Sequence, residues 1–185
     1  MKISMWKRFS CALAVVALAA MAVAAKDVRN ISVRDDCDAT TFNAVIGEGT
    51  CVGDGDTTFD EFVAELPDGH EKWRFNNDRT ETDAAVNATN RGGEVHSFTE
   101  VGKFGGGFIP FLNNPDEDLA PECVLLDANG EAVPADEVSS VPGPGFNPNT
   151  IVPPGKTSPT QTLTKGTHKF QCCIHPWMRS VVTRK

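Results

Sequence analysis

The sequence predicts an all-β protein, a β-sandwich preceded by two short helices. From residue 71 onward, apolar residues recur at every second position in short runs, as in strands with one buried face. Polar turns rich in Gly, Pro and Asn separate these runs, and such spacing is typical of sandwiches. The length of 185 residues suits one domain. We see no internal repeat.

Both helices are predicted upstream of residue 71. The first covers residues 38–47 and ends at Gly47, which can adopt the left-handed conformation of a helix terminus. Its apolar side chains share one face, namely Phe42, Val45 and Ile46. The second helix begins at Thr58, which has capping-box spacing to Glu61, and Pro67 stops it.

Residues 105–155 form a long insertion rich in Gly, Pro and Asn, with 123–126 as the only clear strand candidate. Connections of this length inside a compact domain are usually functional or held by a crosslink. Strands are expected on either side, at 73–75, 86–88, 95–101, 160–172 and 179–183. The prediction is therefore a single domain over 26–185, with a helical N-terminal extension at 26–70 and the insertion at 105–155.

The first 25 residues are predicted to be a cleaved signal peptide. Lys2, Lys7 and Arg8 precede an apolar run that ends in small residues, as secretory signals do. A membrane anchor is the alternative, but the run falls short of the roughly 20 residues that span a bilayer. We expect a secreted or periplasmic protein with no membrane span in its mature chain.

The net charge of the mature chain indicates which kinds of partner it can bind. The whole sequence has a net charge of −8, and removing the signal leaves 14 basic and 25 acidic side chains, a net charge of −11. Such a chain is poorly suited to nucleic acid, which basic residues bind. Steering toward a basic partner is expected instead, with the protein itself a monomer.

The cysteine count is odd once the signal is removed. Five remain, namely Cys37, Cys51, Cys123, Cys172 and Cys173. In an oxidising compartment cysteines pair, so one thiol is left over. Cys37 and Cys51 close a short loop and are predicted to form a disulfide, which could add about 3 kcal/mol of stability. The sequence leaves the other pairings open.

The leftover thiol lies in the densest chemical motif of the chain, Cys172-x-x-His175-x-x-Met178. A tight loop after a strand can direct a thiolate, an imidazole and a thioether to one centre. Soft sulfur with imidazole suits copper, and two histidines, one cysteine and a weak axial methionine form the blue-copper electron-transfer site. A second histidine is therefore required.

Three other histidines are candidates for that position. His96 begins a half-buried strand after a Gly-Gly turn, and we favour it over His70, which sits in a turn and looks exposed. His168 precedes Cys172 by four residues in one strand, so it lies roughly 13 Å away, too far to share a metal.

Other readings of this motif are weaker. A zinc site would recruit His168 or Cys173, yet adjacent cysteines chelate poorly and structural zinc rarely takes methionine. A binuclear copper centre would need cysteines several residues apart, and multicopper oxidases need His-x-His pairs, which are absent. Copper delivery or storage without redox turnover is the main alternative function. A metal-free domain with both Cys172 and Cys173 in disulfides is a third hypothesis.

The ligand motif resembles that of the cupredoxins, especially the plastocyanins and amicyanin. Pro176 lies between the last two ligands, and Phe170 precedes the cysteine by two residues, as in that family. His96 occupies the place of the upstream histidine ligand, whereas Ser97 stands where members often have Asn. The resemblance covers roughly residues 71–104 and 150–185.

This resemblance implies a Greek-key sandwich that holds one type 1 copper per chain. The implied ligands are His96, Cys172, His175 and Met178. The protein would be a one-electron carrier between redox partners and not an enzyme, with His175 as an exposed electron port. Pro176 and Trp177 would form the docking patch around it. Cys173, facing away from the metal, would be free to pair with Cys123 and attach the insertion to the back of the site.

Overall fold

The computed structural model describes residues 27–126, 132–133, 141–142 and 147–185. The predicted signal peptide and parts of the 105–155 insertion lie outside these residues. Within the described residues, no helix has the length and apolar character needed to cross a membrane.

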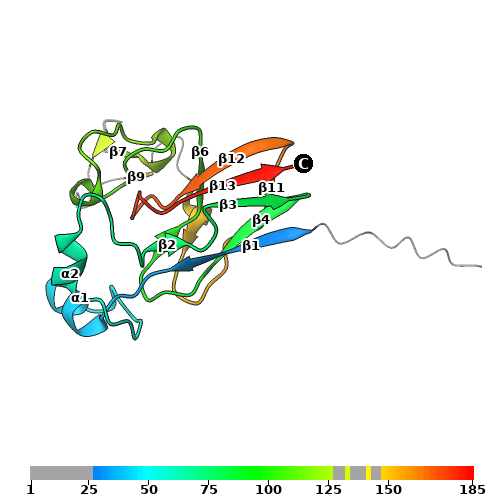
Figure 1. The fold of residues 1–185 in the computed structure, drawn as a ribbon. Helices are drawn as coiled ribbons and strands as arrows, with labels where there is room; N and C mark the ends of the chain where they lie inside the picture. The colour runs from blue at the N-terminus through cyan, green and yellow to red at the C-terminus, as the bar shows by residue number, and fades with distance from the viewer. Residues whose placement is uncertain (1–26, 127–131, 134–140, 143–146) are drawn as a thin grey trace, which may run out of the picture.

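Two four-stranded sheets form the body of the protein (Figure 1). The first has the order β11-β4-β1-β2, with strands Gln161–Thr162, Ala85–Asn90, Val28–Arg34 and Arg74–Phe75. The second has the order β3-β13-β12-β6, with strands Arg79–Thr82, Arg179–Arg184, Gly166–Gln171 and Thr99–Val101. β1 pairs parallel to β4 and β13 parallel to β3, while the remaining pairs in both sheets are antiparallel.

The two sheets share one core. Ile31 and Val86 of the first sheet belong to the same buried cluster as Phe170 and Val182 of the second. The rings of Phe98 and Phe170 stack with centroids 4.3 Å apart. The chain is therefore mostly β, with two layers packed face to face as the sequence predicts.

Smaller sheets complete the fold. β5 (His96–Ser97) pairs with β10 (Ile151–Val152), and β7 (Leu125–Leu126) lies between β8 (Ala132–Val133) and β9 (Val141–Pro142). β7 covers the second half of the strand candidate at 123–126, whereas Cys123 belongs to a 3-10 helix. The part of the chain that the structure describes also holds three short 3-10 helices, with η1 (Pro110–Leu112) and η2 (Pro121–Cys123) between β6 and β7, and η3 (Pro148–Thr150) before β10.

The N-terminal region differs from the predicted helical extension. Residues 28–34 form β1, which adds six aligned pairs to β4 and so belongs to the sandwich. Only Ile31 and Val33 are buried among its seven residues. Two apolar positions among polar neighbours give too weak an alternation for the strand to be recognised in the sequence.

Both predicted helices are present, as α1 (Ala39–Val45) and α2 (Phe59–Ala64). The Thr58 and Glu61 capping box forms at the start of α2, and Gly47 after α1 has φ of 133°. Of the apolar residues expected on one face of α1, Phe42 is buried, whereas Val45 and Ile46 are 63% and 53% exposed. In Figure 1 the helices lie at the same end of the sandwich as the loop between β12 and β13.

Candidate metal centre

A closed loop between β12 and β13 carries most of the predicted site. The strands pair with Gln171 opposite Arg179, so the residues between them must turn back within one loop. The Cys172 amide donates to the Met178 carbonyl at 3.1 Å, and the Met178 amide donates to the His175 carbonyl at 3.0 Å. These two bonds fold the loop so that Cys172 and His175 face the same point.

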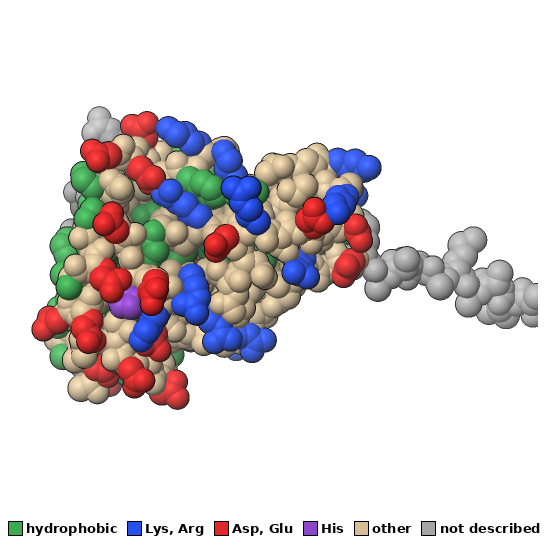
Figure 2. Space-filling model, in the orientation of Figure 1, with side chains coloured by type: hydrophobic (Ala, Val, Ile, Leu, Met, Phe, Trp, Pro, Cys, Tyr) green, Lys and Arg blue, Asp and Glu red, His purple; other side chains and the backbone are tan. Residues whose placement is uncertain are grey.

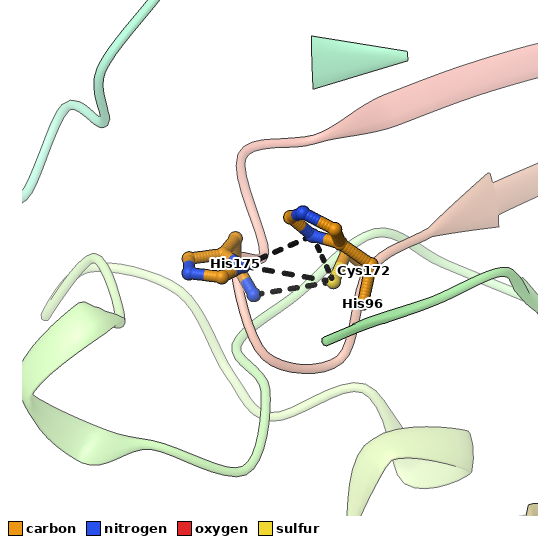
Figure 3. Close-up of side chains that lie close together, drawn as sticks. All are labelled: His96, Cys172 and His175. Carbon is orange, nitrogen blue, oxygen red and sulfur yellow. Dashed lines mark hydrogen bonds between the residues drawn. The ribbon is translucent and has the colours of Figure 1, made fainter. Parts of the chain in front are cut away.

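His96 reaches that point from a different part of the chain. It opens β5, where it pairs with Val152 of β10. Its Nδ1 lies 3.7 Å from Cys172 Sγ and 3.3 Å from His175 Nδ1, and His175 Nδ1 lies 4.0 Å from the sulfur (Figure 3). The structure thus brings together three of the four predicted ligand side chains.

The spacing of these atoms fits a metal ion. Bonds of about 2.0 Å to nitrogen and about 2.3 Å to sulfur, spread at 120°, separate two nitrogens by about 3.5 Å and nitrogen from sulfur by about 3.7 Å. The observed separations of 3.3, 3.7 and 4.0 Å lie close to these values. One thiolate and two imidazoles in a trigonal arrangement are the donor set that copper takes in blue-copper sites.

Met178, the fourth predicted ligand, is buried in the same core cluster as Cys172. It is 1% exposed, and its backbone makes both bonds that close the loop. Met178 would be the fourth residue to hold a copper ion, with a thioether as the weak ligand of the set.

Electrostatics favour the ionised thiol. Burial opposes ionisation of Cys172, but hydrogen bonds and charge from His175 and His96 hold its pKa well below that of an ordinary thiol. Burial likewise opposes protonation of His96, whose bonds to Asp35 and Cys172 nevertheless raise its pKa to about 9. The thiolate that a metal requires is therefore already favoured by its neighbours.

Two backbone amides and one serine hold the sulfur in place. The amides of Ser97 and His175 donate to Cys172 Sγ at 3.3 and 3.4 Å. The Ser97 hydroxyl accepts a bond from the Cys173 amide at 2.7 Å. Ser97, which differs from the residue often found in cupredoxins, therefore links the His96 strand directly to the cysteine loop.

Each histidine also meets a buried carboxylate that the sequence analysis did not identify. His96 Nε2 lies 2.7 Å from Asp35 Oδ2, with both side chains at most 1% exposed. His175 Nε2 lies 3.6 Å from Glu94 Oε2, which also accepts a bond from Trp73 Nε1. Carboxylates in this position fix the orientation of a metal-bound imidazole and raise its basicity.

The two carboxylates differ in their own pKa values. Burial opposes ionisation of Asp35, but the hydrogen bond and charge of His96, with amide bonds from Gly93 and Glu94, lower its pKa below the usual range. Burial raises the pKa of Glu94, and His175 and Trp73 oppose that effect only partly. Asp35 is thus the firmer negative charge of the pair.

The other histidines lie outside this cluster. His70 is 6% exposed, so its expected exposure is wrong; its Nδ1 accepts a bond from the Lys72 amide. His168 pairs with Glu100 on the neighbouring strand at 2.6 Å. The sequence argument favoured His96 over both, and of these three histidines the structure places His96 beside Cys172.

The expected exposure of His175 is also wrong. His175 is 3% exposed, because Phe62 of α2 and Trp177 pack against its ring with centroids 6.1 and 5.5 Å away. Pro176 is buried as well, while Trp177 is partly exposed. Part of this cover comes from α2, which lies in the N-terminal region outside the resemblance to the cupredoxins.

Both expected disulfides are present. Cys37 pairs with Cys51, and Cys123 pairs with Cys173. Among the described residues, Cys172 is the free cysteine. The second disulfide attaches η2 to the residue directly after the candidate ligand.

Comparisons with known proteins give a limited result. No protein-family model matches the chain, and a search of curated proteins finds no similar protein. Among solved structures, a purple cupredoxin from Nitrosopumilus maritimus is 15% identical, covering 63% of this chain and 86% of its own, with a TM-score of 0.32. A reduced Cu(I) form of an amicyanin variant at pH 4 is 17% identical, covering 66% and 89%, with the same TM-score. At this level of similarity, the case for function depends on the site itself.

Proposed function

We propose that this chain is an exported type 1 copper protein of cupredoxin character that carries one electron at a time between redox partners. The observation that carries the proposal is the buried trio of His96, Cys172 and His175, with donor atoms 3.3 to 4.0 Å apart. Met178 would complete the set as the axial ligand, in a Greek-key sandwich.

These residues favour a carrier over an enzyme. With four protein ligands on one copper, no coordination position would remain for a substrate. The ligand side chains are at most 3% exposed; the Ser97 amide donates to Cys172, and Asp35 and Glu94 lie against His96 and His175. When bound, copper supplies one-electron redox chemistry, and a braced site serves both oxidation states with little rearrangement.

The partner would approach the end of the molecule that carries the site. The net charge of −11 expected after signal cleavage favours a partner with a basic docking surface. Because His175 is covered, Trp177 is the better candidate for the electron port; the residue is partly exposed, and its ring lies 5.5 Å from that of His175.

The test is the spectrum of the purified mature chain after addition of Cu(II). We expect an intense visible thiolate-to-copper band and a type 1 paramagnetic-resonance signal. Cys172→Ser should abolish both, and His96→Ala should disrupt them, whereas the matched variant His70→Ala should leave them intact. A colourless wild-type complex that exchanges Cu(I) freely would support delivery or storage instead.

A further inference from the structure

A pocket of about 490 Å³ lies beside the candidate metal centre, on the side of His175. Its walls come from the residues that follow α1, from α2, from the two residues before β5, from η1 and the residue before it, and from the loop after Cys172. Pockets that bind small molecules measure about 300 to 1,000 Å³. This one therefore has the size of a small-molecule site.

Apolar side chains dominate its walls. Phe59, Phe62 and Ile174 line it, together with Ile46 and Phe111, which are 53% and 63% exposed. Large apolar side chains gathered in one exposed concave place mark binding surfaces. Aromatic walls suit a flat aromatic ring, which stacks or meets them edge to face.

The polar side chains that line the pocket are few, namely Glu94, His175 and Thr50. Trp73 and His175 both contact the same oxygen of the Glu94 carboxylate, Oε2. A carboxylate offers about four acceptor positions, so Glu94 can accept a further hydrogen bond. A ligand that donates one hydrogen bond would satisfy this group.

Charge limits the ligand further. Among the described residues that line the pocket there is no Lys or Arg, so an anionic ligand would find no basic side chain there to pair with. Figure 2 shows Asp and Glu side chains gathered over the α1 and α2 end of the molecule, with hydrophobic side chains along the same edge. A neutral ligand is therefore favoured over an anionic one.

We propose that this pocket binds a neutral phenol, with the aromatic ring among the apolar walls and the hydroxyl donating to Glu94. The ligand would lie against His175, which lines the same pocket. The inference concerns binding alone and does not depend on the copper proposal.

The experiment measures binding to the metal-free mature chain, so that its outcome is independent of whether copper binds. Three probes of matched size are titrated at pH 7 and followed by amide chemical shifts: 4-ethylphenol, its methyl ether 4-ethylanisole, and the 4-ethylbenzoate anion. We expect 4-ethylphenol to bind at least about tenfold more tightly than the ether, because the ether cannot donate to Glu94. The anion should bind more weakly still. Glu94→Gln should reduce the preference for the phenol over the ether.

A pair of neighbouring exposed residues provides the control. Ile46 lines the pocket and Val45 does not, although both are more than half exposed, so both variants should fold. Ile46→Glu should weaken 4-ethylphenol binding at least about tenfold, while Val45→Glu should change it less than twofold.

Several outcomes would overturn the proposal. These are the absence of binding by any probe, equal binding of the phenol and the ether, and an Ile46→Glu variant that binds like the wild type. A concentration-dependent dimer that shifts the amides around the pocket would also overturn it, since a second copy of the chain would then be the occupant.

Discussion

Removing the charge of Asp35 should raise the reduction potential of the copper-loaded protein. Asp35→Asn preserves the shape of the side chain, whose oxygens accept bonds from the Gly93 and Glu94 amides at 2.8 and 3.2 Å. It removes the carboxylate that lies 2.7 Å from His96 Nε2. Because both side chains are at most 1% exposed, solvent and salt screen this interaction weakly.

The expected rise in reduction potential follows from the effect of such carboxylates on metal affinity. Removing a group that orients a metal-bound histidine typically lowers metal affinity about 10- to 100-fold, or about 1.4 to 2.8 kcal/mol. The lost negative charge stabilised Cu(II) more than Cu(I), because Cu(II) carries one more positive charge. If the loss falls entirely on Cu(II), the potential rises by about 60 to 120 mV, since a tenfold change equals about 59 mV for one electron.

The assay is a spectroelectrochemical titration of wild type, Asp35→Asn and the control Asp36→Asn. Asp36 is the next residue, but it accepts bonds from Lys72 and Thr57 and does not contact the site. The control should keep the wild-type potential. An unchanged or lower potential in Asp35→Asn, or an equal shift in both variants, would refute the reasoning.

Three further predictions concern stability. In a urea titration, Gly107→Ala should lower the free energy of unfolding by about 1 to 3 kcal/mol or more, because its Cβ would lie 2.0 Å from the Cys173 carbonyl oxygen. The control Gly102→Ala, whose Cβ would have its nearest neighbour 3.5 Å away, should leave that free energy nearly unchanged. Burial opposes protonation of His168, but Glu100 raises its pKa above 6.5, so its stabilisation is complete below pH 6.5 and is lost as pH rises through the folded-state pKa. The loss of melting temperature in His168→Gln should therefore shrink as the pH increases, and a constant loss would contradict this. Replacing Cys123 and Cys173 together with serine should cost about 4 kcal/mol by the chain-entropy estimate for a separation of 50 residues; calorimetry showing no change would contradict it.

Local signals were readable from the sequence. The α2 capping box involves residues three apart, and the Cys172, His175 and Met178 ligands fall within one loop, so a single window of sequence contains each pattern. The parity of the cysteines gave further support for Cys172 as the free thiol. β1 was missed because its burial involves only Ile31 and Val33.

Features that depend on distant packing were not readable. Asp35 and His96 are 61 residues apart, and they meet only because β1 ends beside the turn that leads into β5. Glu94 sits two residues before His96, yet its contact with His175 depends on where the cysteine loop folds. The burial of His175 likewise results from α2, whose own pattern shows a helix but not the surface it covers.

One measurement tests the central claim most directly: coulometric reduction and reoxidation of the copper-loaded chain, with copper determined on the same sample. We predict one copper per chain, with one electron taken up and returned reversibly as the visible band bleaches and recovers. Cys172→Ser should show neither the band nor reversible uptake. A copper-loaded wild type that is colourless, or that loses its copper on reduction, would contradict the electron-carrier account.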